Sequence, residues 1–265
     1  MKEKQQKEIE VIQQAIARTI ATHPEGRNLA LIGGFRYRFL DNSVRTSDDI
    51  DYHWIGDIGE KQRELGDFSS RVLLPEIFRR YGYSGSANVM SEPEDDSPVV
   101  RVVNLSFWKD GVPYSRMEIP VEVTRIVCAD PIEVRTAGGT IYATTSDGDM
   151  IESKVIAIFD RITLRHRDIV DVFLFQDRFL PDSDKRLKSK LQALRITVTD
   201  AEKQMAQFQT DREYHAKATQ AVIDAQLNIE AADQLNDAGG GKMVFDKAIS
   251  ILKQYIRVGG SDESH

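Results

Sequence analysis

Residues 29–54 read LALIGGFRYRFLDNSVRTSDDIDYHW, and this stretch decides the predicted fold. The apolar letters LALI suit a buried strand, and the pair Gly33–Gly34 ends it. A short helix is expected after the glycines, and a second strand at residues 50–54. Asp49 and Asp51 are two residues apart in an extended segment, so both side chains point to the same side of it. This order of elements predicts a site for a phosphate and a metal ion.

The carboxylates suggest which ion this site would take. Two carboxylates on one face of a strand repel each other unless a cation lies between them, and Mg²⁺ (or Mn²⁺) prefers such oxygen ligands. Glycines before a helix let a phosphate approach the backbone, where the helix N-terminus supplies N–H donors.

A third acid is expected on a neighbouring strand. Residues 117–124, MEIPVEVT, alternate between apolar and polar side chains, which places Glu118 and Glu122 on one face. Glu122 is the first candidate because it lies mid-strand among apolar neighbours, where an unpaired carboxylate is costly. Glu118 is the reserve. The alternative is that both carboxylates are solvated on an exposed sheet face.

These residues resemble a known family, the AbiEii/AbiGii toxin group of the polymerase-β-like nucleotidyltransferase superfamily. That group typically reads G-G-x-x-x-R and then R-x-S-x-D-hydrophobic-D, and Arg38, Arg45 and Ser47 fall on the motif positions together with the two aspartates. A second block, IESKVIAIFDR at residues 151–161 and RDIVD at 167–171, resembles two further helical motifs of the family. Gly34 is a departure, since many superfamily members have serine there.

The resemblance implies an enzyme that transfers a nucleoside monophosphate from an NTP to an acceptor and releases pyrophosphate. It implies Asp49, Asp51 and Glu122 as catalytic metal ligands and Lys154 as a catalytic residue that steadies the triphosphate. The residues expected to bind the nucleotide are Gly33, Gly34, Arg38, Arg45, Ser47, Lys154 and Asp168. For Arg161 and Asp168 the alternative is an ion-pair network that ties two helices together.

The same resemblance implies the toxin of a toxin–antitoxin or phage-defence system, with tRNA or another RNA as acceptor and a cognate antitoxin as protein partner. A local basic stretch could contact RNA phosphates, or could be a solvated helix face. Its members are Arg178, Lys185, Arg186, Lys188, Lys190 and Arg195. Two other hypotheses are a small-molecule (antibiotic-type) nucleotidyltransferase and a non-catalytic nucleotide-binding module.

The rest of the chain predicts an α+β fold: a nucleotidyltransferase-like mixed sheet flanked by helices, followed by an all-helical C-terminal bundle. The Gly138–Gly139 pair predicts a hairpin, Pro75 a break in a helix, and Gly239 to Gly241 a flexible joint. Predicted helices cover about residues 4–22, 60–80, 148–162, 167–180, 184–209, 211–236 and 243–257, antiparallel strands lie between 99 and 143, and an exposed loop covers 91–98. The expected domains are a catalytic domain at 1–146, a helical domain at 147–258 and a disordered tail at 259–265.

Composition excludes several other classes of protein. A hydrophobic share of 41% with 29% charged residues predicts an ordinary globular core. The longest apolar runs fall far short of the roughly 20 residues that cross a bilayer, and the N-terminus has no signal-peptide core, so a cytoplasmic protein without membrane contact is expected. Cys128 is the single cysteine, which excludes an internal disulfide and a cysteine metal cluster. A net charge of −7 argues against a general nucleic-acid coat protein.

Overall fold

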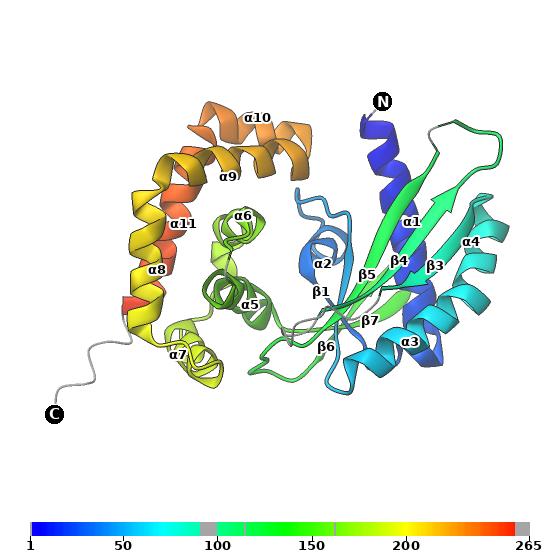
Figure 1. Ribbon diagram of the computed structural model, residues 1–265, viewed down its shortest axis with the longest axis horizontal. Helices are drawn as coiled ribbons and strands as arrows, with labels where there is room; N and C mark the ends of the chain where they lie inside the picture. Colours follow the sequence, from blue (N-terminus) through cyan, green and yellow to red (C-terminus); the bar gives the residue numbers. More distant parts are fainter. Residues whose placement is uncertain (1, 91–99, 114, 162, 258–265) are drawn as a thin grey trace. The chain divides into compact units, whose positions relative to one another are not determined.

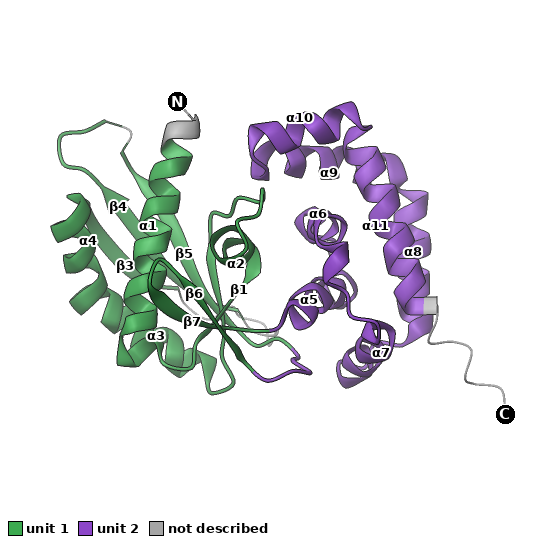
Figure 2. Cartoon of the chain, turned by 180° about the vertical axis from the view of Figure 1, so that it is seen from behind, with its two compact units in different colours: residues 1–126, 132–145 green, residues 127–131, 146–265 purple. Residues whose placement is uncertain are grey.

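The structure, a computed structural model, describes residues 2–90, 100–113, 115–161 and 163–257. The chain forms two units, one of residues 1–126 with 132–145 and one of residues 127–131 with 146–265 (Figure 2). The predicted loop at 91–98 and the predicted disordered tail at 259–265 lie outside the described residues. No helix in the described part of the chain combines the length and hydropathy that a bilayer crossing requires.

A seven-stranded mixed sheet forms the first unit, in the order β3-β4-β5-β2-β1-β7-β6 (Figure 1). Its strands are β1 (Ala30–Ile32), β2 (Ile50–His53), β3 (Ser84–Val89), β4 (Arg101–Trp108), β5 (Met117–Thr124), β6 (Glu133–Ala137) and β7 (Thr140–Thr144). Strand β2 runs antiparallel to β1 and parallel to β5, whereas β1 runs parallel to β7. The predicted mixed sheet is therefore confirmed, as is the hairpin at Gly138–Gly139 between β6 and β7.

The sequence did not predict β3, which forms one edge of this sheet. Its residues, SGSANV, are mostly small or polar and lack the β-branched alternation of a typical strand. It is extended because it pairs along its whole length with β4, from Ser84 opposite Trp108 to Val89 opposite Val103.

The helices of the first unit are α1 (Lys2–Thr22), a 3-10 turn (Pro24–Gly26), α2 (Gly33–Leu40), α3 (Ile58–Phe68) and α4 (Leu74–Tyr81). A π-helical turn, Ser69–Leu73, separates α3 from α4. The helix predicted at 60–80 is thus interrupted, but just before Pro75. The proline is the second residue of α4 and follows the π-helical turn closely. Because proline has no N–H to donate, the regular hydrogen-bond pattern of the helix changes at this point.

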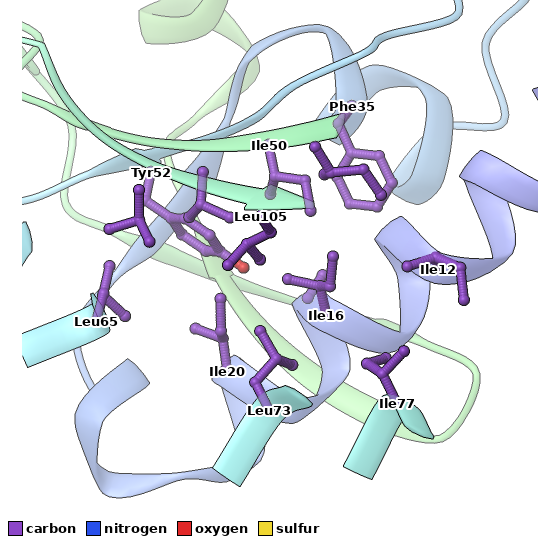
Figure 3. Close-up of a cluster of buried hydrophobic side chains, with 14 of the residues drawn as sticks. Ile12, Ile16, Ile20, Phe35, Ile50, Tyr52, Leu65, Leu73, Ile77 and Leu105 are labelled. Atoms are coloured by element: carbon purple, nitrogen blue, oxygen red, sulfur yellow. The ribbon is translucent and has the colours of Figure 1, made fainter. Parts of the chain in front are cut away.

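The core of this unit lies between one face of the sheet and helices α1, α3 and α4 (Figure 3). The helices contribute Ile12, Ile16, Ile20, Leu65, Leu73 and Ile77, and the strands Leu31, Ile50, Tyr52, Leu105, Val121 and Val123. Because side chains alternate along a strand, burial of Ile50 and Tyr52 turns Asp51 to the opposite face, and burial of Val121 and Val123 does the same for Glu122.

The second unit is all-helical, as predicted. It contains α5 (Asp147–Asp160), α6 (His166–Leu174), a 3-10 turn (Gln176–Arg178), α7 (Ser183–Ala193), α8 (Val198–Thr210), α9 (Arg212–Gln226), α10 (Ile229–Asp237) and α11 (Gly240–Arg257).

Two predicted long helices of this unit are each divided, which corrects the expected ranges 184–209 and 211–236. The first divides after Ala193, and Thr197 then begins α8 with a capping box that includes Asp200. The second divides at Leu227, whose backbone is extended, and the Asn228 side chain caps the next helix by accepting from the N–H of Ala231.

The predicted joint at Gly239 to Gly241 is part of the packed start of α11. A Cβ atom added at Gly241 would lie 2.8 Å from Gln220 Cα, so this glycine permits close approach of α11 to α9.

A buried ion network joins α5, α7 and residues 127–131 within the second unit. Asp149 and Glu152 are both fully buried, and Lys190 Nζ lies 2.6 Å and 2.7 Å from their carboxylate oxygens. Arg186 lies 2.8 Å from both Asp130 and Glu152. The predicted basic stretch is therefore not one surface, because Arg186 and Lys190 pair with internal carboxylates.

Candidate active site

Three carboxylates meet on the sheet face opposite the core. Asp49 directly precedes β2, Asp51 lies within β2, and Glu122 is the residue of β5 that pairs with Asp51 in the parallel register. One ligand oxygen from each lies within 4.8 Å of the others. Asp49 is buried, and the other two are half-buried. Among the described residues, no other group of three acidic, histidine or cysteine side chains has this geometry.

Such a cluster fits a divalent cation. At 4.8 Å, two carboxylates repel each other by about 3 kcal/mol at an effective dielectric constant of ~20. A hard cation that takes oxygen ligands relieves this repulsion for each pair at once, and carboxylate oxygens are the ligands that Mg²⁺ and Mn²⁺ prefer. The donor set therefore suits the metal that the sequence predicted.

Glu118, the reserve candidate for the third acid, lies outside this cluster. Its carboxylate accepts hydrogen bonds from Ser106 Oγ at 2.6 Å, Asn104 Nδ2 at 2.8 Å and Arg116 Nε at 3.0 Å. The Ser106 hydroxyl above all, together with the other two donors, holds the pKa of Glu118 below its usual range. The parallel register thus brings Glu122, and not Glu118, to the aspartates.

The glycine pair lies directly against these acids. Gly33 has φ +77°, and a Cβ atom added there would lie 2.7 Å from Asp51 Cγ, so only glycine fits. A Cβ at Gly34 would lie 2.9 Å from Ser47 Oγ and 3.7 Å from an Arg45 terminal nitrogen. The first turn of α2, with its N–H donors, and the Arg45 guanidinium therefore lie close to the carboxylate-bearing segment.

Ser47 contacts one of the acids directly. Its hydroxyl donates to Asp49 Oδ1 at 2.5 Å, and its backbone oxygen accepts from Gln13 Nε2 at 2.8 Å. The sequence had suggested Ser47 as a phosphate ligand and had not singled out Gln13. A signal was present, because Gln13 interrupts the apolar stripe of α1 between Ile12 and Ile16.

Arg38, predicted to bind nucleotide, bridges α2 to α1. Its guanidinium donates to both carboxylate oxygens of Glu10 at 3.2 Å and to Ser43 O at 2.8 Å. The adjacent Arg36, which the sequence did not single out, is fully buried and bonds to Asp41 and to Thr144 Oγ1. The two arginines therefore attach α2, which begins at Gly33, to its neighbours in the first unit: Arg38 to α1 and Arg36 to β7.

The predicted residues of the second unit form their own ion cluster. Lys154 Nζ lies 3.3 Å from Asp168 and 3.1 Å from Asp171, and Arg161 lies 2.9 Å from Asp168. The helix-tying ion pairs considered for Arg161 and Asp168 are therefore present, and they also hold the Lys154 ammonium.

No family model and no curated protein matches the chain. Several solved structures are similar to it. A protein of H. pylori, described provisionally as a nucleotidyltransferase, has a TM-score of 0.53 at 16% identity, with 97% of each chain covered. MenT4, a nucleotidyltransferase toxin of Mycobacterium tuberculosis, has a TM-score of 0.52 at 16% identity, covering 98% of this chain and 89% of that one. At this identity the likeness shows the fold, so the chain has a nucleotidyltransferase fold, and the similarity extends to a toxin without singling out the AbiEii group.

Proposed function

We propose that the protein is a metal-dependent nucleotidyltransferase that moves a nucleoside monophosphate from an NTP to an acceptor hydroxyl. The observation that carries this proposal is the group of Asp49, Asp51 and Glu122 beside the Gly33–Gly34 turn. The fold shared with nucleotidyltransferases supports it.

In the proposed reaction, the acceptor hydroxyl loses its proton to solvent and its oxygen bonds to the α-phosphorus. The bond from that phosphorus to the α–β bridging oxygen breaks, and pyrophosphate leaves with that oxygen. Asp49, Asp51 and Glu122 would hold the divalent cations. Such ions would neutralise charge that develops on the phosphoryl group and would lower the pKa of the attacking hydroxyl.

Other residues bind the donor nucleotide. The N–H groups at Gly33 and Gly34 and the Arg45 guanidinium contact the β- and γ-phosphates. For Lys154 and Asp168, the support for a role in nucleotide binding is the motif resemblance. A lysine ammonium is a compact point charge of the kind that binds phosphate oxygens, and that of Lys154 lies 3.3 Å from Asp168.

The biological role we propose is that of a toxin in a toxin–antitoxin or phage-defence system, with tRNA or another RNA as acceptor and an antitoxin as partner. The motif resemblance and the fold shared with MenT4 support this role. Within the basic stretch, Lys185 and Arg195 are exposed and suited to RNA phosphates, whereas Arg178 pairs with Asp147.

The test is incubation of the protein with each α-labelled NTP, Mg²⁺ and either total RNA or cell lysate, following where the label goes. Asp49→Asn, Asp51→Asn and Glu122→Gln should each reduce transfer by more than about 100-fold, since changes behind a metal ligand already cost about 10–100-fold. Glu118→Gln is the matched control, because it removes a carboxylate of the same strand face outside the cluster. Full Mg²⁺-dependent turnover by Asp49→Asn would refute the assignment.

The same experiment separates the other hypotheses. Label on a tRNA band supports the toxin role, whereas label only on small molecules identifies an antibiotic-type enzyme. Binding of Mg-NTP in calorimetry without transfer of label to any acceptor would indicate a non-catalytic nucleotide-binding module.

A further inference from the structure

A chain of two hydrogen bonds runs from α1 to the carboxylate cluster. Gln13 Nε2 donates to Ser47 O at 2.8 Å, and Ser47 Oγ donates to Asp49 Oδ1 at 2.5 Å. All three residues are buried, with exposed fractions of 0% for Gln13, 6% for Ser47 and 8% for Asp49. The glutamine therefore acts on the segment before β2 from an element 34 residues earlier in the sequence.

Gln13 occupies a position where an apolar side chain would be expected. It lies on the buried stripe of α1 between Ile12 and Ile16, which are 1% and 0% exposed. Its Oε1 atom is buried and has no hydrogen-bond partner among the described residues. An unsatisfied buried acceptor costs free energy, which an apolar residue of similar size would not. The amide stabilises the fold through its bond to Ser47 O, and the unpaired Oε1 offsets part of that stabilisation, so the gain in stability from this glutamine is small.

Ser47 has little freedom to move. A Cβ atom at Gly34 would lie 2.9 Å from Ser47 Oγ and 3.3 Å from its Cβ, so the serine side chain packs against the first turn of α2. With its backbone oxygen fixed by Gln13 and its side chain confined by Gly34, the Ser47 hydroxyl points at one oxygen of Asp49. This hydrogen bond restrains the orientation of the Asp49 carboxylate group.

We propose that Gln13 is a positioning residue that, through Ser47, fixes the orientation in which Asp49 presents its carboxylate to a divalent cation. This inference rests on the proposed function. Hydrogen bonds to a metal-ligating carboxylate orient it and tune its affinity for the ion. Gln13 itself touches neither ion nor nucleotide.

The test is the affinity for Mn²⁺ alone, measured by calorimetry or electron paramagnetic resonance on folded protein. Gln13→Met keeps the side-chain volume and removes the donor, and it should weaken Mn²⁺ binding by about tenfold, at the low end of the effects of changes behind metal ligands. The matched control is Gln62→Met. Gln62 is also a buried glutamine of the first unit, whose Nε2 donates to Val102 O at 2.7 Å and Met90 O at 3.0 Å, and its loss should leave Mn²⁺ affinity unchanged.

A double-mutant cycle shows whether Gln13 acts through Ser47. If it does, Gln13→Met adds little to the loss already caused by Ser47→Ala, because residues of one hydrogen-bond network are non-additive. Independent, additive losses would overturn the proposal, as would wild-type Mn²⁺ affinity in Gln13→Met. If Gln13→Met is not recovered as a folded protein, Gln13→Ala removes the same donor and the same outcomes decide.

The Asp49→Asn variant distinguishes failure of the proposed metal site from failure of the proposed positioning role of Gln13. If wild type and Asp49→Asn bind Mn²⁺ equally, the proposed metal site fails. If Asp49→Asn loses binding and Gln13→Met retains it, only the positioning role of Gln13 fails.

Discussion

Replacement of Gly33 by alanine tests the proposed site at its closest contact. The new Cβ would overlap Asp51 Oδ2 most closely, and would lie 2.7 Å from Asp51 Cγ and 2.9 Å from Asp51 Cβ. Non-bonded carbon atoms pack at about 3.5–4.0 Å, so the Asp51 side chain must move by about 1 Å. The alanine would also adopt φ +77°, which costs a side-chain-bearing residue about 1–2 kcal/mol.

The strain and the displacement can be separated with a matched control. Gly139 has φ +76°, and a Cβ atom added there would meet nothing within 4 Å. Gly139→Ala should therefore lower the free energy of unfolding by about 1–2 kcal/mol without affecting the carboxylates. Gly33→Ala should do at least as much, and should also reduce nucleotidyl transfer by about 100-fold, because a displacement of about 1 Å at a reacting centre has effects of that size.

The assays are urea unfolding, Mn²⁺ titration and transfer of α-labelled nucleotide, carried out on both variants. The expected pattern is a loss of stability in both variants, at least as large in Gly33→Ala, with loss of metal affinity and transfer in Gly33→Ala alone. Wild-type Mn²⁺ affinity and transfer in a folded Gly33→Ala protein would refute the placement of Asp51 against the glycine turn.

Three further predictions concern the second unit. Lys190→Met removes one of the two cations that contact the fully buried carboxylates of Asp149 and Glu152, and leaves Arg186 as the other. It should lower the free energy of unfolding by about 3 kcal/mol, measured with urea; a loss below about 1 kcal/mol would contradict the buried network. Burial lowers the pKa of His166 from 6.5 to about 4, and burial also lowers that of its hydrogen-bonded neighbour His215. The unfolded chain therefore binds more protons than the folded chain between about pH 4 and 6.5, so the free energy of unfolding should fall as the pH falls through that range. The fall should be less steep in His166→Gln. Equal slopes of the free energy of unfolding against pH in the two proteins would count against the prediction. Asn228→Ala removes the cap of α10 and should cost about 1 kcal/mol in a thermal or urea unfolding experiment, whereas no change would show that the cap contributes nothing.

The parts of the site that sequence could predict are those encoded over short distances. Gly33, Gly34, Asp49 and Asp51 belong to one strand–helix–strand stretch, so their spacing alone indicates which side chains share a face. The choice between Glu118 and Glu122 as the third acid could not be made from such short-range spacing. It depends on how β5 aligns with β2, a pairing between segments about 70 residues apart that no local pattern fixes.

The same distinction explains the errors in the helical unit. The charges of Arg186 and Lys190 were visible, but their partners at Asp149 and Glu152 lie 34 or more residues earlier, so the stretch resembled a solvated face. The break at Asn228 had a local signal, a residue type favoured at N-caps, which the apolar periodicity around it obscured.

The segment at residues 127–131 constrains how this protein can be divided experimentally. It lies in sequence between β5 and β6 of the first unit, yet it belongs to the second, so the chain passes from one unit to the other after residues 126, 131 and 145. A fragment that begins at residue 146 would lack Ala129 and Asp130, and with them one carboxylate partner of Arg186 and two backbone donors to Asp149. A fragment that ends at residue 145 would carry those groups into water without their partners. Truncation is therefore unsuited to assigning activities to either half, and during synthesis residues 127–131 complete their contacts only after α7 has emerged.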